Sequence, residues 1–339
     1  MIGYPLSFIY LSPQFILQKK TMRRVFSIAL AALVFIAMTS FNAKKSETRI
    51  AEAKDLIGRW DLTVDVNGKP EPSWMEVKLS GFKTLVGYYV ALHGSARPVA
   101  KIEFDNGKFS FKIPPQWEAG DKDMVIEGKL ENDKVIGTVT DSEGKTYKFT
   151  GVRAPLLVRK KAPVWGKPIK LFNGKDLKGW KAIGGTNNWV VKNGILTNTK
   201  AGANLITNQK FDDFKLHIEF RYQKDGNSGV YLRGRHEVQI EDSPAGTHPN
   251  NVLYGGVYGF LTPSEINAKG PGEWQTYDIT LIGRMVTIVS NGKTIISNQE
   301  IPGITGGALD SNEGEPGPIY LQGDHQPVEF RNIIITPAK

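Results

Sequence analysis

Three segments, 215–222, 227–234 and 236–242, alternate apolar side chains with polar side chains that could take part in chemistry. The polar positions carry carboxylates, guanidinium groups, a phenol and an amide. Carboxylates can transfer protons, and guanidinium groups can stabilise negative charge that develops on a substrate. Because alternate residues of a strand share one face, the pattern predicts a polar face formed by Glu219, Arg221, Tyr231, Arg233, Glu237 and Gln239. A solvated surface is the alternative for each of these residues taken singly.

A second polar group, Gln322, Asp324 and His325, lies between the apolar segments 319–321 and 328–335. This position predicts a loop at the rim of a sheet, where binding residues are common. The imidazole of His325 could titrate near neutral pH or bind a metal, and a hydrogen bond to the backbone is its alternative role. The sequence requires no cofactor. A divalent metal bound by Glu237, Asp324 and His325 is the alternative that the residues leave open.

Short alternating segments also fill residues 58–153, where turn signals such as Asn67-Gly68 and Asn132-Asp133 separate them. Seven or eight such segments in so short a stretch predict a small up-and-down antiparallel β-barrel. The tripeptide Gly58-Arg59-Trp60 resembles the Gly-x-Trp that opens lipocalin-like barrels, in which the tryptophan closes one end. A core position in another β-meander is the alternative for Trp60.

About a dozen further short segments follow residue 169, and none shows a sustained helical period. An all-β second half with two packed sheets is therefore expected. Residues 154–168 contain three prolines and four cationic residues without a strand pattern, which is typical of a linker. The expected organisation is a leader at 1–43, a barrel at 55–155, a linker at 156–168 and a β-sandwich at 169–339.

The chain of 339 residues contains no cysteine. This absence excludes disulfide scaffolds, thiol nucleophiles, cysteine-bound zinc and a lipoprotein anchor. The formal net charge is +9, and six of these charges belong to residues 1–45, which contain no acidic residue. The remaining charge is spread over β-rich sequence without a basic helix, so no nucleic-acid partner is expected.

The arginine pair Arg23-Arg24 precedes an apolar segment, 25–38, that is interrupted only by Ser27. This order is typical of a secretory signal, and the segment is short for a membrane span. We expect an exported protein, periplasmic or secreted, without a stable membrane span after cleavage. An uncleaved N-terminal anchor is the alternative.

Ordered motifs in the second half resemble those of the 3-keto-disaccharide hydrolase domain family over about residues 165–337. They are LFNGKDLKGW (171–180), NSGVYLRG (227–234), HEVQIEDS (236–243), GGVYG (255–259), GEWQTYDI (272–279), SNGK (290–293) and IYLQGDHQPVEFRNIII (319–335). The resemblance implies a concanavalin A-like jelly roll whose concave face binds sugars. It also implies cleavage of glycosides that carry a ketone at carbon 3. The chain departs from the family at Gln275, where asparagine is usual, and at Gln326, where glycine is frequent.

Such a ketone acidifies the hydrogen on carbon 2, so that a base can remove it and the glycosidic oxygen on carbon 1 can leave. Water can then add back to complete hydrolysis. For this route Glu237 is the expected base, Arg233 the enolate stabiliser, and His325 or Glu219 the acid. The alternative is ordinary glycoside hydrolysis by two carboxylates, Glu219 and Glu237.

Several other residues are expected to contact an oligosaccharide or keto-sugar substrate through stacking or hydrogen bonds. They are Gln239, Tyr231, Trp274, Tyr258, Arg221, Asp324 and Gln322. Two alternative functions remain open at the level of the sequence. One is a non-catalytic carbohydrate-binding protein on the same sandwich, and the other is a barrel that binds a small apolar molecule.

Overall fold

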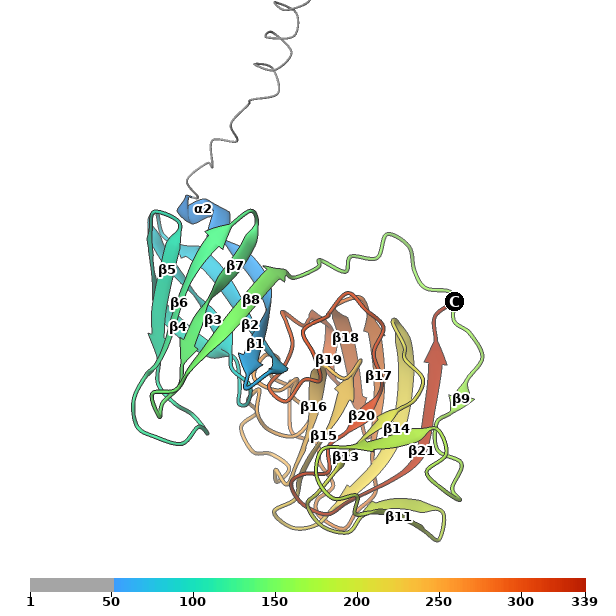
Figure 1. Cartoon of the computed structure of the whole chain (residues 1–339). Coiled ribbons are helices and arrows are strands. Elements are labelled where there is room, and N and C mark those ends of the chain that lie inside the picture. Colours follow the sequence, from blue (N-terminus) through green and yellow to red (C-terminus); the bar gives the residue numbers. More distant parts are fainter. Residues whose placement is uncertain (1–51) are drawn as a thin grey trace, which may run out of the picture. The chain divides into compact units, whose positions relative to one another are not determined.

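A computed structural model describes residues 52–339, and the predicted leader lies outside them. The first part is a closed barrel of antiparallel strands in sequential order, with β8 paired back to β1 (Figure 1). A short helix, α2 (Ala53–Leu56), precedes the barrel. The predicted up-and-down barrel is thus confirmed. Its strands are β1 (Gly58–Val66), β2 (Lys69–Ser80), β3 (Thr84–Val90), β4 (Arg97–Asp105), β5 (Lys108–Ile113), β6 (Met124–Glu131), β7 (Lys134–Thr140) and β8 (Thr146–Arg153).

Trp60 closes the end of the barrel next to α2. Its side chain is fully buried, and its indole N–H donates to the carbonyl oxygen of Leu56 at 2.9 Å. The guanidinium group of Arg153 lies 3.8 Å from the centre of the tryptophan ring and donates to the carbonyl oxygen of Ile57. Trp60 therefore serves as both a core aromatic and an end plug.

The second part is a sandwich of a five-stranded and an eight-stranded sheet, as the alternating segments predict. The five-stranded sheet has the order β10 (Trp180–Ile183), β13 (Asn204–Thr207), β20 (Tyr320–Leu321), β15 (Asn227–Leu232) and β16 (His236–Glu241). The larger sheet has the order β11 (Trp189–Lys192), β12 (Ile195–Asn198), β21 (Val328–Pro337), β14 (Phe214–Tyr222), β17 (Gln275–Ile282), β18 (Met285–Ser290) and β19 (Lys293–Glu300), with β9 (Ile169–Lys170) paired to β21.

The core of the sandwich lies between the two sheets. Ile218 and Phe220 of β14 enter it from the larger sheet, and Val230 and Val238 enter it from the smaller one. The opposite face of the smaller sheet is therefore free to carry the polar residues of β15 and β16.

The expected linker packs along the sandwich. The guanidinium group of Arg284 donates to the carbonyl oxygen of Pro155 at 2.8 Å, and Arg159 donates to Asp213 at 2.7 Å. Trp165 forms an isolated bridge with Ala338 near the last strand. These contacts attach the segment to the sandwich along its length.

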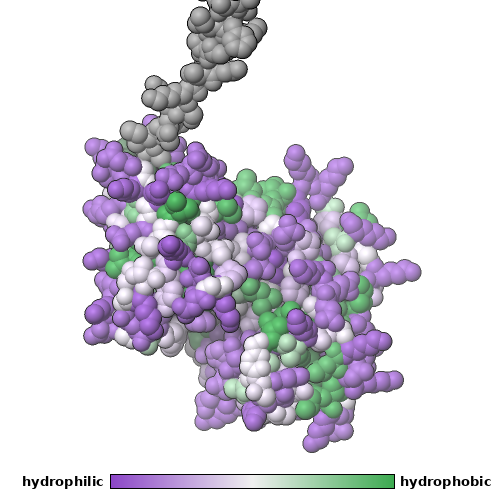
Figure 2. Space-filling model, in the orientation of Figure 1, coloured by the Kyte–Doolittle hydropathy of each residue, from purple (hydrophilic) through white to green (hydrophobic). Residues whose placement is uncertain are grey.

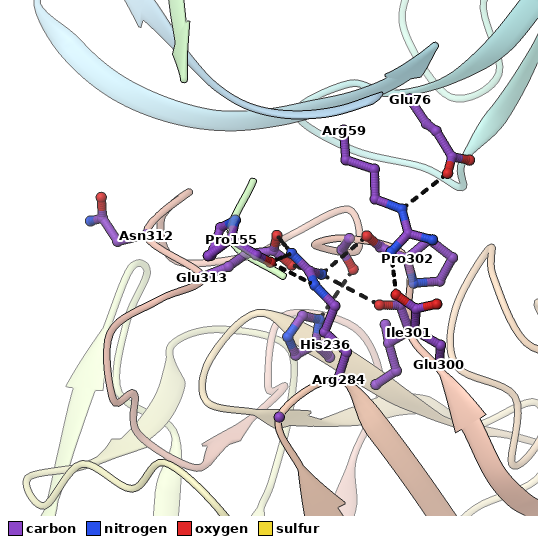
Figure 3. A network of polar contacts seen from close by, with 12 residues as sticks. Arg59, Glu76, Pro155, His236, Arg284, Glu300, Ile301, Pro302, Asn312 and Glu313 are labelled. Carbon is purple, nitrogen blue, oxygen red and sulfur yellow. Dashed lines mark hydrogen bonds and ion pairs between the residues drawn. The ribbon is translucent and has the colours of Figure 1, made fainter. Parts of the chain in front are cut away.

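Charged side chains join barrel strands to sandwich loops (Figure 3). Arg59 of β1 contacts Glu76 of β2 at 3.0 Å and also contacts Glu300 at the end of β19. The buried pair Arg284 and Glu313 lies close to this group, with 2.8 Å between Nη1 and Oε1. Apolar side chains also join the two parts. Trp74 of the barrel packs edge to face on Phe260 of the sandwich, with 5.4 Å between the ring centres.

Hydrophilic residues dominate the visible face, and smaller hydrophobic areas interrupt them (Figure 2). Within residues 52–339, no helix has both the length and the apolar character needed to cross a membrane.

Candidate active site

Glu237 and Tyr231 form the centre of a polar group on the five-stranded sheet. They face each other across β15 and β16, and the Tyr231 hydroxyl donates to Glu237 Oε2 at 2.9 Å. The same hydroxyl lies 3.0 Å from the carbonyl oxygen of Gly306. The backbone N–H of Glu237 donates to Thr305 Oγ1. The loop at 303–308 therefore holds both residues from one side.

Burial raises the pKa of Glu237 to about 8, against the opposing effect of the Tyr231 hydrogen bond. The negative charge of Asp324 is a smaller contribution to the same upward shift in this pKa. The side chain is only 4% exposed, so water solvates its charged form poorly. A carboxyl group with this pKa can gain or lose a proton near neutral pH, which suits it to general acid–base chemistry.

Gly229 makes room for the Glu237 carboxyl group. It lies on β15 opposite Gln239, and a Cβ atom at this position would overlap Glu237 Oε1. The carboxyl group therefore extends over the backbone of β15, with Oε2 held by Tyr231. Gly229 was not among the residues predicted for the site, although a glycine inside an alternating strand indicates a close approach of another group to the backbone.

Amide side chains lie one row along the same face. The register places Asn204 and Gln322 near Gly229 and Gln239. Gln239 donates to the carbonyl oxygen of Val252 at 3.3 Å, but its Oε1 atom has no hydrogen-bond partner among residues 52–339. The Oε1 atom of Gln322 is also buried and also lacks a hydrogen-bond partner among residues 52–339. Buried amide oxygens without a hydrogen-bond donor are unusual. The two free oxygens could accept hydrogen bonds from the hydroxyl groups of a ligand.

Asp324 and His325 form a polar pair beside this face. Asp324 Oδ1 and His325 Nδ1 are 2.8 Å apart, and both side chains are nearly half exposed. The hydrogen bond to Asp324 raises the pKa of His325 against the effect of burial. For Asp324, burial would raise the pKa, but the His325 contacts outweigh it and the net shift is downward. The pair can therefore hold a proton on the imidazole next to an ionised carboxylate.

Two further tyrosines complete the group. Tyr320 stacks on Tyr231 with 4.3 Å between ring centres and an interplanar angle of 11°. The backbone N–H of Tyr258 donates to the carbonyl oxygen of Glu237 at 3.0 Å. The sequence predicted Tyr258 and missed Tyr320, whose position depends on the pairing of β20 with β15.

Glu219, Arg221 and Trp274 gather elsewhere, on the outer face of the larger sheet. Arg331 donates to Glu219 at 2.6 Å, and the guanidinium groups of Arg331 and Arg221 lie 3.9 Å and 4.8 Å from the ring of Trp274. β14 directs Ile218 and Phe220 into the core, so its polar residues face away from the sandwich interior. The single polar face predicted from the sequence is therefore two faces on different sheets.

Arg233 lies in the turn after β15. Its φ angle is 52°, so the strand alternation ends at Leu232. The buried guanidinium group donates to the carbonyl oxygen of Gly283 at 2.5 Å and to Asp212 at 3.3 Å. These bonds tie Arg233 to the β17–β18 turn, away from the row that contains Glu237.

Within residues 52–339, no group of three His, Asp or Glu side chains is arranged to bind a metal ion. The metal set considered from the sequence, Glu237, Asp324 and His325, does not form such a group.

Similar proteins share the second half of the chain. A 3-keto-disaccharide hydrolase from Bacteroides thetaiotaomicron is 23% identical over a match that covers 38% of this chain and 57% of that protein. Two crystal structures of proteins provisionally assigned as glycosyl hydrolases, both from Parabacteroides distasonis, are 33% and 21% identical. They match 50% and 51% of this chain and 82% and 94% of their own chains, with TM-scores of 0.43 and 0.41.

The sequence model of the 3-keto-alpha-glucoside-1,2-lyase-like domain matches residues 167–336, which is half of the chain. The chain therefore belongs to the 3-keto-alpha-glucoside-1,2-lyase-like domain family.

Proposed function

We propose that the protein is an enzyme that cleaves glycosides bearing a ketone at carbon 3, with its active site on the five-stranded sheet. The observation that carries the proposal is the buried Glu237 carboxyl group, which is held by Tyr231 at 2.9 Å and is influenced by the negative charge of Asp324, the hydrogen-bond partner of His325. Membership of the family and the name of the B. thetaiotaomicron relative support the substrate class.

In the proposed reaction, Glu237 in its ionised form removes the proton from carbon 2 of the keto sugar. Oε2 remains hydrogen-bonded to Tyr231, so Oε1, which extends over Gly229, is the oxygen that accepts the proton. A buried carboxyl group with a pKa of about 8 is a stronger base than an exposed one. The electron pair of the C–H bond moves onto the ketone oxygen and gives an enolate.

The remaining groups stabilise the enolate and the leaving oxygen. Amide N–H groups of Gln239 and Gln322 can donate to the enolate oxygen. When the enolate collapses, the bond from carbon 1 to the glycosidic oxygen breaks, and the protonated His325 supplies a proton to that oxygen. Addition of water to the resulting double bond completes net hydrolysis and returns a proton to carbon 2.

The experiment that tests this function is NMR product analysis after the purified protein is incubated with 3-keto-trehalose, with and without a chelator. We expect cleavage at carbon 1. Binding without cleavage, for this and several other 3-keto-glycosides, would favour the non-catalytic carbohydrate-binding function instead. Activity that the chelator abolishes would indicate a metal.

Export to the periplasm or the medium is part of the proposal and rests on Arg23-Arg24 and the apolar segment 25–38. Fractionation of the producing bacterium tests it. Recovery of the protein in the cytoplasm would contradict it.

A second candidate function belongs to the barrel. A cavity of about 140 Å³ opens between strand ends and is lined mainly by apolar side chains, among them Val64, Tyr89 and Met124. Dry apolar cavities of about this size can bind benzene-sized molecules. An NMR titration with benzene tests this function, and Ala91→Phe, which fills part of the cavity, should abolish the chemical shift changes. Changes that persist in this variant would place binding elsewhere.

A further inference from the structure

The barrel contacts both sandwich loops that hold Glu237. The backbone N–H of Gly307 donates to the carbonyl oxygen of Leu92 at 3.2 Å, next to the Gly306 carbonyl that contacts Tyr231. A Cβ atom at Gly259 would lie 2.6 Å from the backbone nitrogen of Ala96, so this neighbour of Tyr258 is also close to the barrel. The barrel is therefore part of the surroundings of the candidate active site.

The barrel loop at 114–123 is anchored on its own domain. The Glu118 carboxylate accepts hydrogen bonds from Arg97 at 2.7 Å and from the backbone N–H of Gln116 at 2.8 Å. The side chain of Gln116 accepts from the backbone N–H of Ser95 at 2.9 Å. These bonds fix the backbone on both sides of Trp117.

Trp117 is nevertheless 70% exposed. A large aromatic side chain in water loses the free energy that its burial would provide, and here a well-anchored backbone presents it. An exposed aromatic ring on a well-anchored backbone can stack against a ligand that has an apolar face.

Trp117 is also connected to the candidate active site. A Cβ atom at Gly94 would lie 3.1 Å from the indole ring of Trp117, and a Cβ atom at Gly306 would overlap the carbonyl oxygen of Gly94. The side chain of Trp117 also lies close to that of Tyr258. Tyr258 in turn donates its backbone N–H to the Glu237 carbonyl oxygen. These contacts place Trp117 beside the two sandwich loops that hold Glu237 and Tyr231.

We infer that Trp117 is a stacking platform for the sugar ring on the leaving side of the bond, so that the barrel supplies part of the substrate site. This inference rests on the proposed function, in which the keto sugar occupies the position at Glu237. The pyranose ring has an apolar face that can lie on the indole. A disaccharide should use the platform, and a keto sugar with a methyl leaving group should not.

The test compares Trp117→Ala with two controls. Trp117→Phe keeps an aromatic ring, and Phe82→Ala removes an aromatic side chain that is 98% exposed on the β2–β3 turn. For 3-keto-trehalose we expect Trp117→Ala to raise KM by about three- to tenfold with kcat within twofold of the wild type. KM for methyl 3-keto-glucoside should stay unchanged, and both controls should resemble the wild type.

A binding measurement separates this inference from the proposed function. Calorimetry with 3-keto-trehalose is carried out in the Glu237→Gln background, with and without Trp117→Ala. A three- to tenfold weaker affinity that is confined to the disaccharide supports the platform, even if the wild type cleaves nothing. Equal affinities, or equal losses for the disaccharide and the methyl glycoside, would overturn it whether or not cleavage occurs.

Discussion

The hydroxyl of Tyr231 lies 2.9 Å from Glu237 Oε2, in a pair of residues that face each other across β15 and β16. The hydrogen bond lowers the pKa of Glu237, which burial raises to about 8. Tyr231 therefore helps to set the pH at which the carboxyl group of Glu237 can act as a base. The carbonyl oxygen of Gly306, at 3.0 Å, is a second acceptor for the Tyr231 hydroxyl.

Tyr231→Phe should shift the pH profile of cleavage. In the wild type, kcat/KM should rise with pH up to about 8, because Glu237 must lose its proton to act as a base. The variant lacks the hydrogen bond that lowers this pKa, so the rising limb should move to higher pH. Profiles of kcat/KM for both proteins test this, and an unchanged limb with a uniformly lower rate would contradict it.

Gly229→Ala should displace the Glu237 carboxyl group, because the new Cβ atom would overlap Oε1. A displacement of about 1 Å in a reacting group can cost roughly a hundredfold in rate, and a loss of this order in kcat is expected. Gly314→Ala is the matched control, since its nearest neighbour atom would lie at an ordinary 3.6 Å. Equal activity of the two variants would show that Gly229 is not needed for this geometry.

Arg233→Lys should reduce stability rather than chemistry. The guanidinium group bonds Gly283 at 2.5 Å and Asp212 at 3.3 Å, and lysine cannot reproduce both contacts. We expect a destabilisation of about 1–3 kcal/mol, with kcat of the folded protein within a few-fold of the wild type. Denaturant unfolding and steady-state kinetics measure both quantities. A large loss of kcat without loss of stability would restore Arg233 as the enolate stabiliser.

Asp61 should make stability depend on pH. Burial and the neighbouring carboxylate of Glu313 raise its pKa to about 9. Between its unfolded pKa of 3.8 and about 9, the folded protein binds more protons than the unfolded chain, so stability should fall as the pH rises. Asp61→Asn removes this proton and should flatten the decline between pH 6 and 9. Equal pH dependence of Tm in both proteins would contradict the effect.

Strand alternation was sufficient to place Tyr231, Glu237 and Gln239 on one face, because it is a local property of the backbone. It could not assign β14 to the other sheet, since pairing between distant strands is not local, and this placement separates Glu219 from Glu237. Arg233 departs from the alternation because its backbone turns at a φ of 52°. The contributions of Asn204 and Tyr320 depend on the register of β13, β20 and β15.

In the barrel, too, local sequence patterns predicted the strands but not the contacts with the other domain. The hairpin signals of the barrel predicted the strands, whose turns place Asn67 and Asn132 at positive φ angles. Nothing in the local pattern indicated that Trp117 would lie near the sandwich loop at 303–308, because that proximity depends on the packing of one domain on the other.

The most direct test of Glu237 as the base follows the hydrogen on carbon 2 of a 3-keto-glycoside by NMR in D₂O. The wild type and Glu219→Gln should both exchange or lose this hydrogen and release the leaving group. Glu219 is a suitable control because its carboxylate is bound by Arg331 and Asn332 on the other sheet. Glu237→Gln should leave the hydrogen and the glycosidic bond intact. Loss of the hydrogen with cleavage in the Glu237→Gln variant would contradict the assignment of Glu237 as the base.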